Sequence, residues 1–181
     1  MTHLKAAAFA VIAAAPAGAS SVIEVARAYA RLGTLVTAIE AADLADMLAG
    51  PGPFTLYAPT DDAFADLPAG SVEALLDPAN GDSLNRIVLY HVDDRALRST
   101  DLPGGTIRVR TMLESARLCV TNDRDGVRLA DSTQQEARVV EADVQADNGV
   151  IHVIDKVLVP GGLLDCESRE WVIRPQARGA P

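Results

Sequence analysis

The chain has 181 residues, which suffices for one domain with a sizeable core and is too few for two. Acidic residues outnumber basic ones by 25 to 16, and the resulting net charge of −9 makes nucleic acid and anionic membranes poor partners. The two cysteines show neither C-x-x-C nor His-Cys spacing, so the sequence offers no ordinary zinc site.

The first residues have the pattern of a secretory signal peptide. Lys5 precedes an apolar run over residues 6–15, and Ala17-Gly18-Ala19 supplies the small residues of a cleavage site. We therefore expect a signal peptide over residues 1–19, a folded domain over 20–160 and a C-terminal tail over 161–181. No later run has the length of a transmembrane segment, so a secreted, periplasmic or extracellular location is predicted.

Helical spacing of apolar residues dominates the first half of the chain. Val22, Val25, Ala26 and Tyr29 recur at the period of an amphipathic helix, which Gly33 ends. Thr34, Thr60, Ser71 and Asp82 are candidate caps of later helices. The predicted helices lie at residues 21–32, 34–42, 43–48, 60–67, 71–76 and 83–90.

Strands follow the helices. Alternating residues predict a strand at 54–58 and others at 106–111, 116–121, 127–130 and 137–141, with a hairpin turn over 122–126. The strongest pattern runs from Asn148 to Pro160, where apolar residues dominate both faces, as in a central strand covered on both sides. Helices first and strands later indicate an α+β domain with a largely non-parallel sheet system.

Cys119 and Cys166 are the only cysteines in a chain that we expect to enter an oxidising compartment. Alternation places Cys119 on the polar face of its strand with Arg117 and Thr121, where a tail carrying Cys166 reaches it. A disulfide between them and two unpaired thiols are the two interpretations.

Three landmarks in fixed order resemble the signature of the fasciclin domain. They are the stretch from Phe54 to Phe64, the pair Tyr90-His91, and the segment from Asn148 to Pro160. The resemblance covers about residues 22–160. It implies a compact wedge of two packed β-sheets with several helices along one edge. It also implies a family that works by binding, in adhesion or envelope contacts, without a common catalytic centre.

The resemblance also implies where a partner binds. In integrin-binding animal relatives, determinants have been proposed around a Tyr-His pair and at a Glu-Pro-Asp-Ile-Met type motif. The first corresponds to Tyr90 and His91, and the second falls on residues 141–145, where Asp143 matches and Val144 replaces Ile. Pro and Met are also replaced, which argues against an integrin as the target. Tyr90, His91, Asp143 and Val144 are the candidate partner-binding residues.

No reactive constellation stands out, so no catalytic, cofactor-binding or metal-binding residue is predicted. His91 and His152 suit buried, hydrogen-bonded roles better than those of a base or metal ligand, since no nucleophile lies beside them and no Gly-x-Ser-x-Gly turn occurs. Residues 121–126 resemble half a calcium loop, but Ser132 stands where a bidentate carboxylate is needed.

The sequence thus predicts a non-catalytic binding module that contacts a cell-surface or envelope protein. A carrier of a small molecule or glycan, using a cleft between sheet and helices, is the alternative. Arg108 and Arg110 alternate along a strand near Arg117, which suits either solubility or contact with an anion or acidic glycan. Trp171, in the tail, is expected to pack against the domain edge.

Overall fold

A computed structural model gives the fold, and it describes residues 20–133, 135–161 and 166. The predicted signal peptide, most of the tail and Trp171 lie outside these residues. Helices precede most of the strands, as expected for an α+β protein. The helices are α1 (Val22–Ala28), α2 (Gly33–Ala41), α3 (Ala45–Ala49), α4 (Asp61–Ala65), α5 (Ser71–Leu76) and α6 (Gly81–Tyr90), with short 3-10 turns at η1 (Pro78–Asn80) and η2 (Ser99–Asp101).

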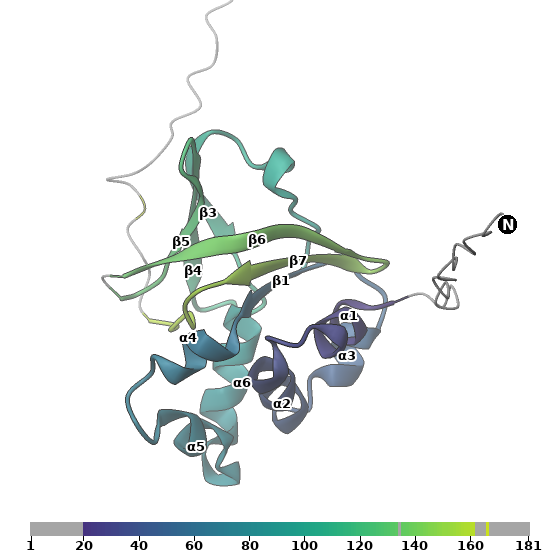
Figure 1. Ribbon diagram of the computed structural model, residues 1–181, viewed down its shortest axis with the longest axis vertical. Helices are drawn as coiled ribbons and strands as arrows, with labels where there is room; N and C mark the ends of the chain where they lie inside the picture. The colour runs from purple at the N-terminus through teal and green to yellow at the C-terminus, as the bar shows by residue number, and fades with distance from the viewer. Residues whose placement is uncertain (1–19, 134, 162–165, 167–181) are drawn as a thin grey trace, which may run out of the picture.

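Within the described residues, seven strands form one mixed sheet in the order β2-β1-β7-β6-β5-β4-β3. Only β1 and β7 pair in parallel; the other neighbours are antiparallel. Figure 1 shows the helices gathered on one side of these strands. The strands are β1 (Phe54–Pro59), β2 (Val92–Asp93), β3 (Gly105–Arg110), β4 (Arg117–Asp123), β5 (Gly126–Ala130), β6 (Glu136–Ala146) and β7 (Gly149–Ile154).

The sheet curls into a nearly closed barrel where two packed sheets had been expected. The long strand β6 explains the difference, because its first residues pair with β5 and its later residues pair with β7. One continuous ladder therefore joins the two halves. The Met112 N–H also donates to the Val92 carbonyl, at 2.7 Å, and so connects the segment after β3 with β2 at the other end of the sheet.

Strand β7 is buried on both faces, as its sequence predicts. Ile151 and Val153 face the helices, whereas Ile154 lies in a second core inside the curl of the sheet. The covering layers are helices on one side and the rest of the same sheet on the other. The first core includes Ile23, Ile39, Leu56, Ala58, Leu84 and Val88. The second includes Val109, Leu118, Val120, Leu129, Ala137 and Leu158.

The turn before β7 fixes where that strand starts. The Asn148 amide donates to the Leu48 and Gly50 carbonyls, and its oxygen accepts from the Val22 N–H, so it links the start of α1 to the end of α3. A Cβ on Gly149 would lie 2.1 Å from the Phe54 oxygen, so only glycine allows β1 to approach this closely.

Strand β7 ends at Ile154, earlier than the predicted Pro160. Asp155 breaks the ladder: its N–H donates to the Arg138 carbonyl, and its carboxylate accepts the Arg138 N–H at 2.7 Å. The chain then turns, so that the Leu158 N–H reaches the ring of His91 and the Val159 N–H reaches Asp131. Asp155 is exposed, although it falls within the segment that was predicted to be a strand covered on both sides.

Only one of the predicted helix caps acts as expected. The Thr60 hydroxyl accepts from the Ala63 N–H at the start of α4. Ser71 is the first residue of α5, and Thr34 and Asp82 are the second residues of α2 and α6, so none of the three is the cap. At α2 the Thr34 N–H is instead satisfied by the Asp61 carboxylate of α4, at 2.7 Å, so a distant side chain replaces the local cap.

Candidate functional site

His91, which follows α6, is buried and fully hydrogen-bonded. Its Nε2 accepts from the Leu158 N–H at 2.9 Å, so Nδ1 carries the proton and donates to the Ile87 carbonyl at 2.8 Å. Burial lowers the pKa of His91 to about 4. The neutral ring therefore has no lone pair left for a metal or a substrate proton. His91 thus has the buried, hydrogen-bonded role that the sequence suggested.

Tyr90 is also buried, and it ties α6 to the curled sheet. Its hydroxyl donates to the Arg117 carbonyl at 2.8 Å, and burial raises its pKa above the ordinary range. Tyr90 and His91 were predicted to contact a partner. In the folded domain their exposed fractions are 1% and 2%, so a partner docking on the surface cannot reach them.

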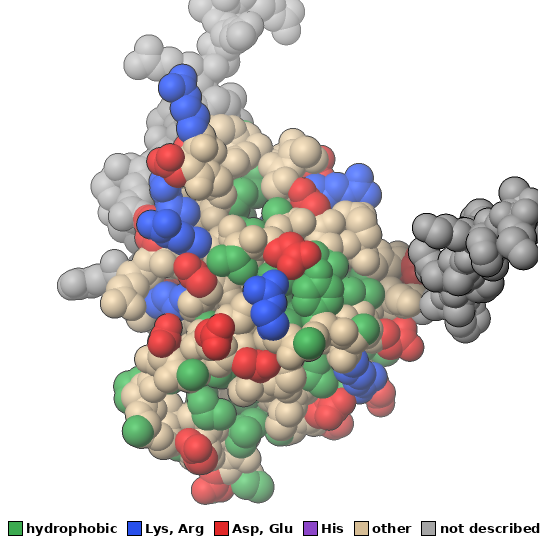
Figure 2. Space-filling view, viewed as in Figure 1, with side chains coloured by type: hydrophobic (Ala, Val, Ile, Leu, Met, Phe, Trp, Pro, Cys, Tyr) green, Lys and Arg blue, Asp and Glu red, His purple; other side chains and the backbone are tan. Residues whose placement is uncertain are grey.

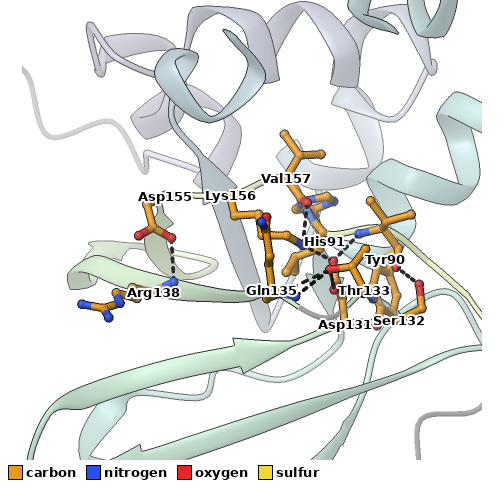
Figure 3. A network of polar contacts seen from close by, with 12 residues as sticks. Tyr90, His91, Asp131, Ser132, Thr133, Gln135, Arg138, Asp155, Lys156 and Val157 are labelled. Carbon is orange, nitrogen blue, oxygen red and sulfur yellow. Dashed lines mark hydrogen bonds and ion pairs between the residues drawn. The ribbon is translucent and has the colours of Figure 1, made fainter. Parts of the chain in front are cut away.

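A buried ion pair lies next to these two residues and joins the end of β5 to the chain after β7. Figure 3 shows the Lys156 side chain reaching Asp131, whose carboxylate also accepts from Thr133 and from the Val159 N–H. Burial acts to raise the pKa of Asp131, but these hydrogen bonds outweigh it and hold the pKa below its usual value. This ion pair was not predicted from the sequence. A lysine within an apolar strand is the signal that predicts a buried carboxylate partner.

An open groove of about 780 Å³ lies beside this ion pair, between the sheet and the end of α4. Arg138 and Lys156 line it together with the carboxylates of Asp66, Glu136 and Asp155. In Figure 3 the Arg138 side chain extends away from Asp155, which bonds only its backbone. The groove is thus a polar cleft between sheet and helices, rimmed by charges of both signs.

A second cavity lies under α5, and it is apolar and small. It is lined by residues of α2, α5 and α6 together with Phe64 and His91, and its volume is about 20 Å³. That is room for one water molecule at most. The packing of α5 therefore leaves no preformed chamber for a larger apolar ligand at this place.

Asp143 and Val144 lie at a bulge in β6, where the register with β7 shifts between Glu141 and Val144. Asp143 has a φ of 60°, and its carboxylate accepts from both the N–H and the hydroxyl of Ser99. These bonds lower its pKa against the opposing effect of burial. Val144 is half-buried and packs against the first core.

His152 holds the bulge from the other side. The Asp143 N–H donates to its Nδ1 at 3.3 Å, and its Nε2 then donates to the Leu97 carbonyl at 2.7 Å. The ring is therefore neutral, and burial lowers its pKa. Tyr57 stacks on it at 5.9 Å between centroids.

The four predicted partner-binding residues form two separate clusters. Among the described residues, no hydrogen bond joins Tyr90 or His91 to the Asp143 bulge. Tyr57 connects the clusters only indirectly, because its N–H donates to the His91 carbonyl while its ring stacks on His152.

The structure joins Cys119 to Cys166 by a disulfide with 5.9 Å between the Cα atoms. Cys119 lies on the outer face of β4, as the alternation of its strand predicted, but it is buried and not open to solvent. The hairpin turn predicted over residues 122–126 is shorter in the structure: only Arg124 and Asp125 connect β4 to β5, and Asp123 forms an ion pair with Arg128 beside them.

In the described part of the chain, no group of three or more His, Cys, Asp or Glu side chains is placed to hold a metal ion. No helix there combines the length and apolar character needed to cross a membrane.

Comparison with known proteins places this fold in a family. The sequence pattern of the fasciclin domain matches residues 30–160. Protein sll1483 of Synechocystis is 42% identical over 147 residues, which cover 81% of this chain and 77% of that protein. The transforming growth factor-beta-induced protein ig-h3 of Sus scrofa is 36% identical over 77% of this chain, but the match spans only 19% of its own length.

A solved structure shows the same fold. The FAS1 domain pair of the insect cell adhesion molecule Fasciclin I matches with a TM-score of 0.66, over 83% of this chain and 53% of that one, at 19% identity. Together with the sequence match over residues 30–160, this likeness shows that the chain belongs to the fasciclin domain family.

Proposed function

We propose that this fasciclin domain is a secreted or periplasmic, non-catalytic module that binds a protein of the cell surface or envelope. Family membership supports the proposal, because Fasciclin I is a cell adhesion molecule. The hydrogen bonding of His91 and His152 supports it further, since the rings of both are engaged within the fold. The disulfide fits an oxidising compartment outside the cytoplasm.

The observation that carries the proposal is the surface of β6 around the bulge. Val140 is 51% exposed, which is unusual for a strand valine, and Ala142 and Gln145 are exposed beside it. The Asp143–Ser99 bonds and His152 hold this segment in one conformation. A preorganised, partly apolar strand surface suits protein contact, because little ordering is lost on binding. Asp143 and Val144 form part of this surface, whereas Tyr90 and His91 belong to the other, buried cluster.

Titration of the labelled, exported protein onto intact cells of the source organism tests the proposal. Binding should be saturable, should disappear after protease treatment of the cells, and should weaken about tenfold in Val140→Asp through loss of an apolar contact and introduction of a charge. Val159→Asp is the matched control, since Val159 is also exposed, at 38%, but lies after β7. Non-saturable binding, or binding that survives protease, would contradict the proposal.

A carrier of a small polar molecule is the second candidate, and the groove beside α4 favours it. Its volume of about 780 Å³ suits a small ligand, and Arg138 and Lys156 supply positive charge near the carboxylates of Asp66 and Asp155. A thermal unfolding screen with small acids, sugars and amino acids tests this function. A ligand that raises the unfolding temperature of the unaltered protein but not of Arg138→Ala would support the carrier function. A screen in which no compound raises the unfolding temperature would contradict it.

A further inference from the structure

The outer face of the sheet carries a group of arginines that the proposed protein contact does not use. The registers of β3, β4, β5 and β6 bring five of them to the same side, opposite the second core, because directly paired residues share a face. We call this surface the arginine face. Its members are Arg108 and Arg110 of β3, Arg117 of β4, Arg128 of β5 and Arg138 of β6.

Two arginine pairs on this face lie directly opposite each other across strands. Arg110 pairs with Arg117, and Arg128 pairs with Arg138. Like charges at such positions destabilise a sheet. In a chain with a net charge of −9, this concentration of positive charge is a local reversal. Figure 2 shows Lys and Arg side chains along the upper left of the molecule, where Figure 1 places β3, β4 and β5.

Most of this charge is not neutralised within the described part of the chain. Arg128 pairs with Asp123, Asp125 and Glu136. Arg117 donates only to the carbonyls of Glu114 and Ala116, which carry no net charge. Arg108, Arg110 and Arg138 are exposed and have no carboxylate within ion-pair distance among the described residues. Residues 161–181 contain three acidic residues and three arginines, so by sequence that segment adds no net charge.

The spacing of these guanidinium groups suits a polymer better than a single small anion. Arg108 and Arg110 stand two residues apart on the edge strand, about 7 Å, and the face extends over three strand spacings of about 5 Å each. Each guanidinium can bind a carboxylate or sulfate through two parallel hydrogen bonds. An extended chain with an anionic group on successive units would meet several arginines at once.

The chemistry of the face selects a polysaccharide over a nucleic acid. Bases of single strands stack on aromatic side chains, and the residues between the arginines are Thr106, Thr121, Cys119 and Ala130. The disulfide in the middle of the face also fits a compartment outside the cytoplasm, where acidic glycans are available and nucleic acid is not the usual partner. We propose that the arginine face binds an acidic polysaccharide. Arg108 and Arg110 lie on β3, three strands away from β6, so they can be tested independently of the protein contact proposed at the β6 bulge.

Titration of the full chain with size-defined heparin oligosaccharides tests the proposal, with heparin as the acidic glycan probe. Arg108→Glu and Arg110→Glu should each weaken binding at least about tenfold, because each removes a charge-assisted contact. Each should also lower the slope of log Kd against log salt by about one. Arg108→Lys, which keeps the charge, should bind within a few-fold of the unaltered protein. Arg86→Glu is the matched control, because it makes the same change of net charge on the exposed face of α6.

Thermal unfolding of every variant checks that the substituted, exposed positions leave the fold intact. Failure of the unaltered protein to bind heparin at low salt would overturn the proposal, and so would equal weakening by Arg86→Glu and Arg108→Glu. Duplex DNA that binds as tightly as heparin, with the same dependence on Arg108, would overturn the assignment to a polysaccharide. Protease treatment of cells, which decides the protein contact at β6, has no bearing on these outcomes, so the two proposals fail separately.

Discussion

His91 shows how a residue that resembles a catalytic base becomes part of the scaffold. Both ring nitrogens are engaged by backbone groups, one of α6 and one of the segment after β7. The sequence indicated burial correctly, because no nucleophile lies nearby in it. It could not show that Leu158 is the donor, since the turn that brings Leu158 to the ring depends on the early end of β7.

The buried state of His91 predicts a pH dependence of stability. In the unfolded chain the ring has its ordinary pKa of 6.5, whereas burial lowers the folded-state pKa to about 4. The contribution of the neutral ring to the free energy of unfolding is therefore fully present above pH 6.5. It is lost as the pH falls from 6.5 towards 4. The loss amounts to about 3 kcal/mol. The lowered pKa of His152 acts in the same direction.

Urea unfolding at pH 7 and at about pH 4.5 measures this effect. The free energy of unfolding should fall by about 3 kcal/mol more in the unaltered protein than in His91→Ala, which cannot take up the proton. At pH 7 His91→Ala should be the less stable of the two, because the Leu158 N–H and the Ile87 carbonyl lose their partner. An equal fall with pH in both proteins would show that His91 is not buried neutral.

At the scale of elements, Asp61 connects two helices. It begins α4, yet its carboxylate caps α2 by accepting the Thr34 N–H at 2.7 Å, and its own N–H donates to the Arg31 carbonyl at 2.9 Å. Asp61→Ala should lower the free energy of unfolding by about 1 kcal/mol, the usual cost of a lost cap. Asp61→Asn should recover most of that loss.

Asp62→Ala provides the control for this prediction. Asp62 is also in the first turn of α4 but is exposed, so it interacts with the helix dipole without capping α2. Denaturant unfolding of the three variants separates the two effects. If Asp61→Ala and Asp62→Ala destabilise equally, the carboxylate acts only through the dipole of its own helix and the bridge to α2 contributes nothing.

The elements themselves were largely predictable, and their ends were not. Helical spacing located α1 and the apolar stripe of α6, and alternation located β3, β4 and β5 to within a few residues. The predicted ends of β6 and β7 were wrong, because the true ends depend on partners far along the chain. Asp155 stops β7 by bonding to Arg138, and the bulge at Asp143 lets β6 continue to Ala146. Neither interaction has a local signal.

At the scale of the whole molecule, the fold family could be predicted from local motifs, whereas the surfaces proposed to bind could not. Three short motifs indicated the fasciclin fold, because they specify the central strands and the buried polar groups that position them. The arginine face is different, since its charges become neighbours only through the registers of four strands. The sequence placed Arg108, Arg110 and Arg117 together but gave no sign that Arg138 shares their face.

The disulfide links that face to the tail and predicts a further property of the whole chain. Cys119 and Cys166 are 47 residues apart, and closing a loop of that length stabilises by about 4 kcal/mol in the chain-entropy model. Reduction of the intact protein should therefore lower its denaturation midpoint, to the level of the double variant Cys119→Ala, Cys166→Ala. The double variant should not respond to reductant, which makes it the control for unspecific effects. A midpoint of the intact protein that is unchanged by reductant would mean that the bridge does not restrict the unfolded chain.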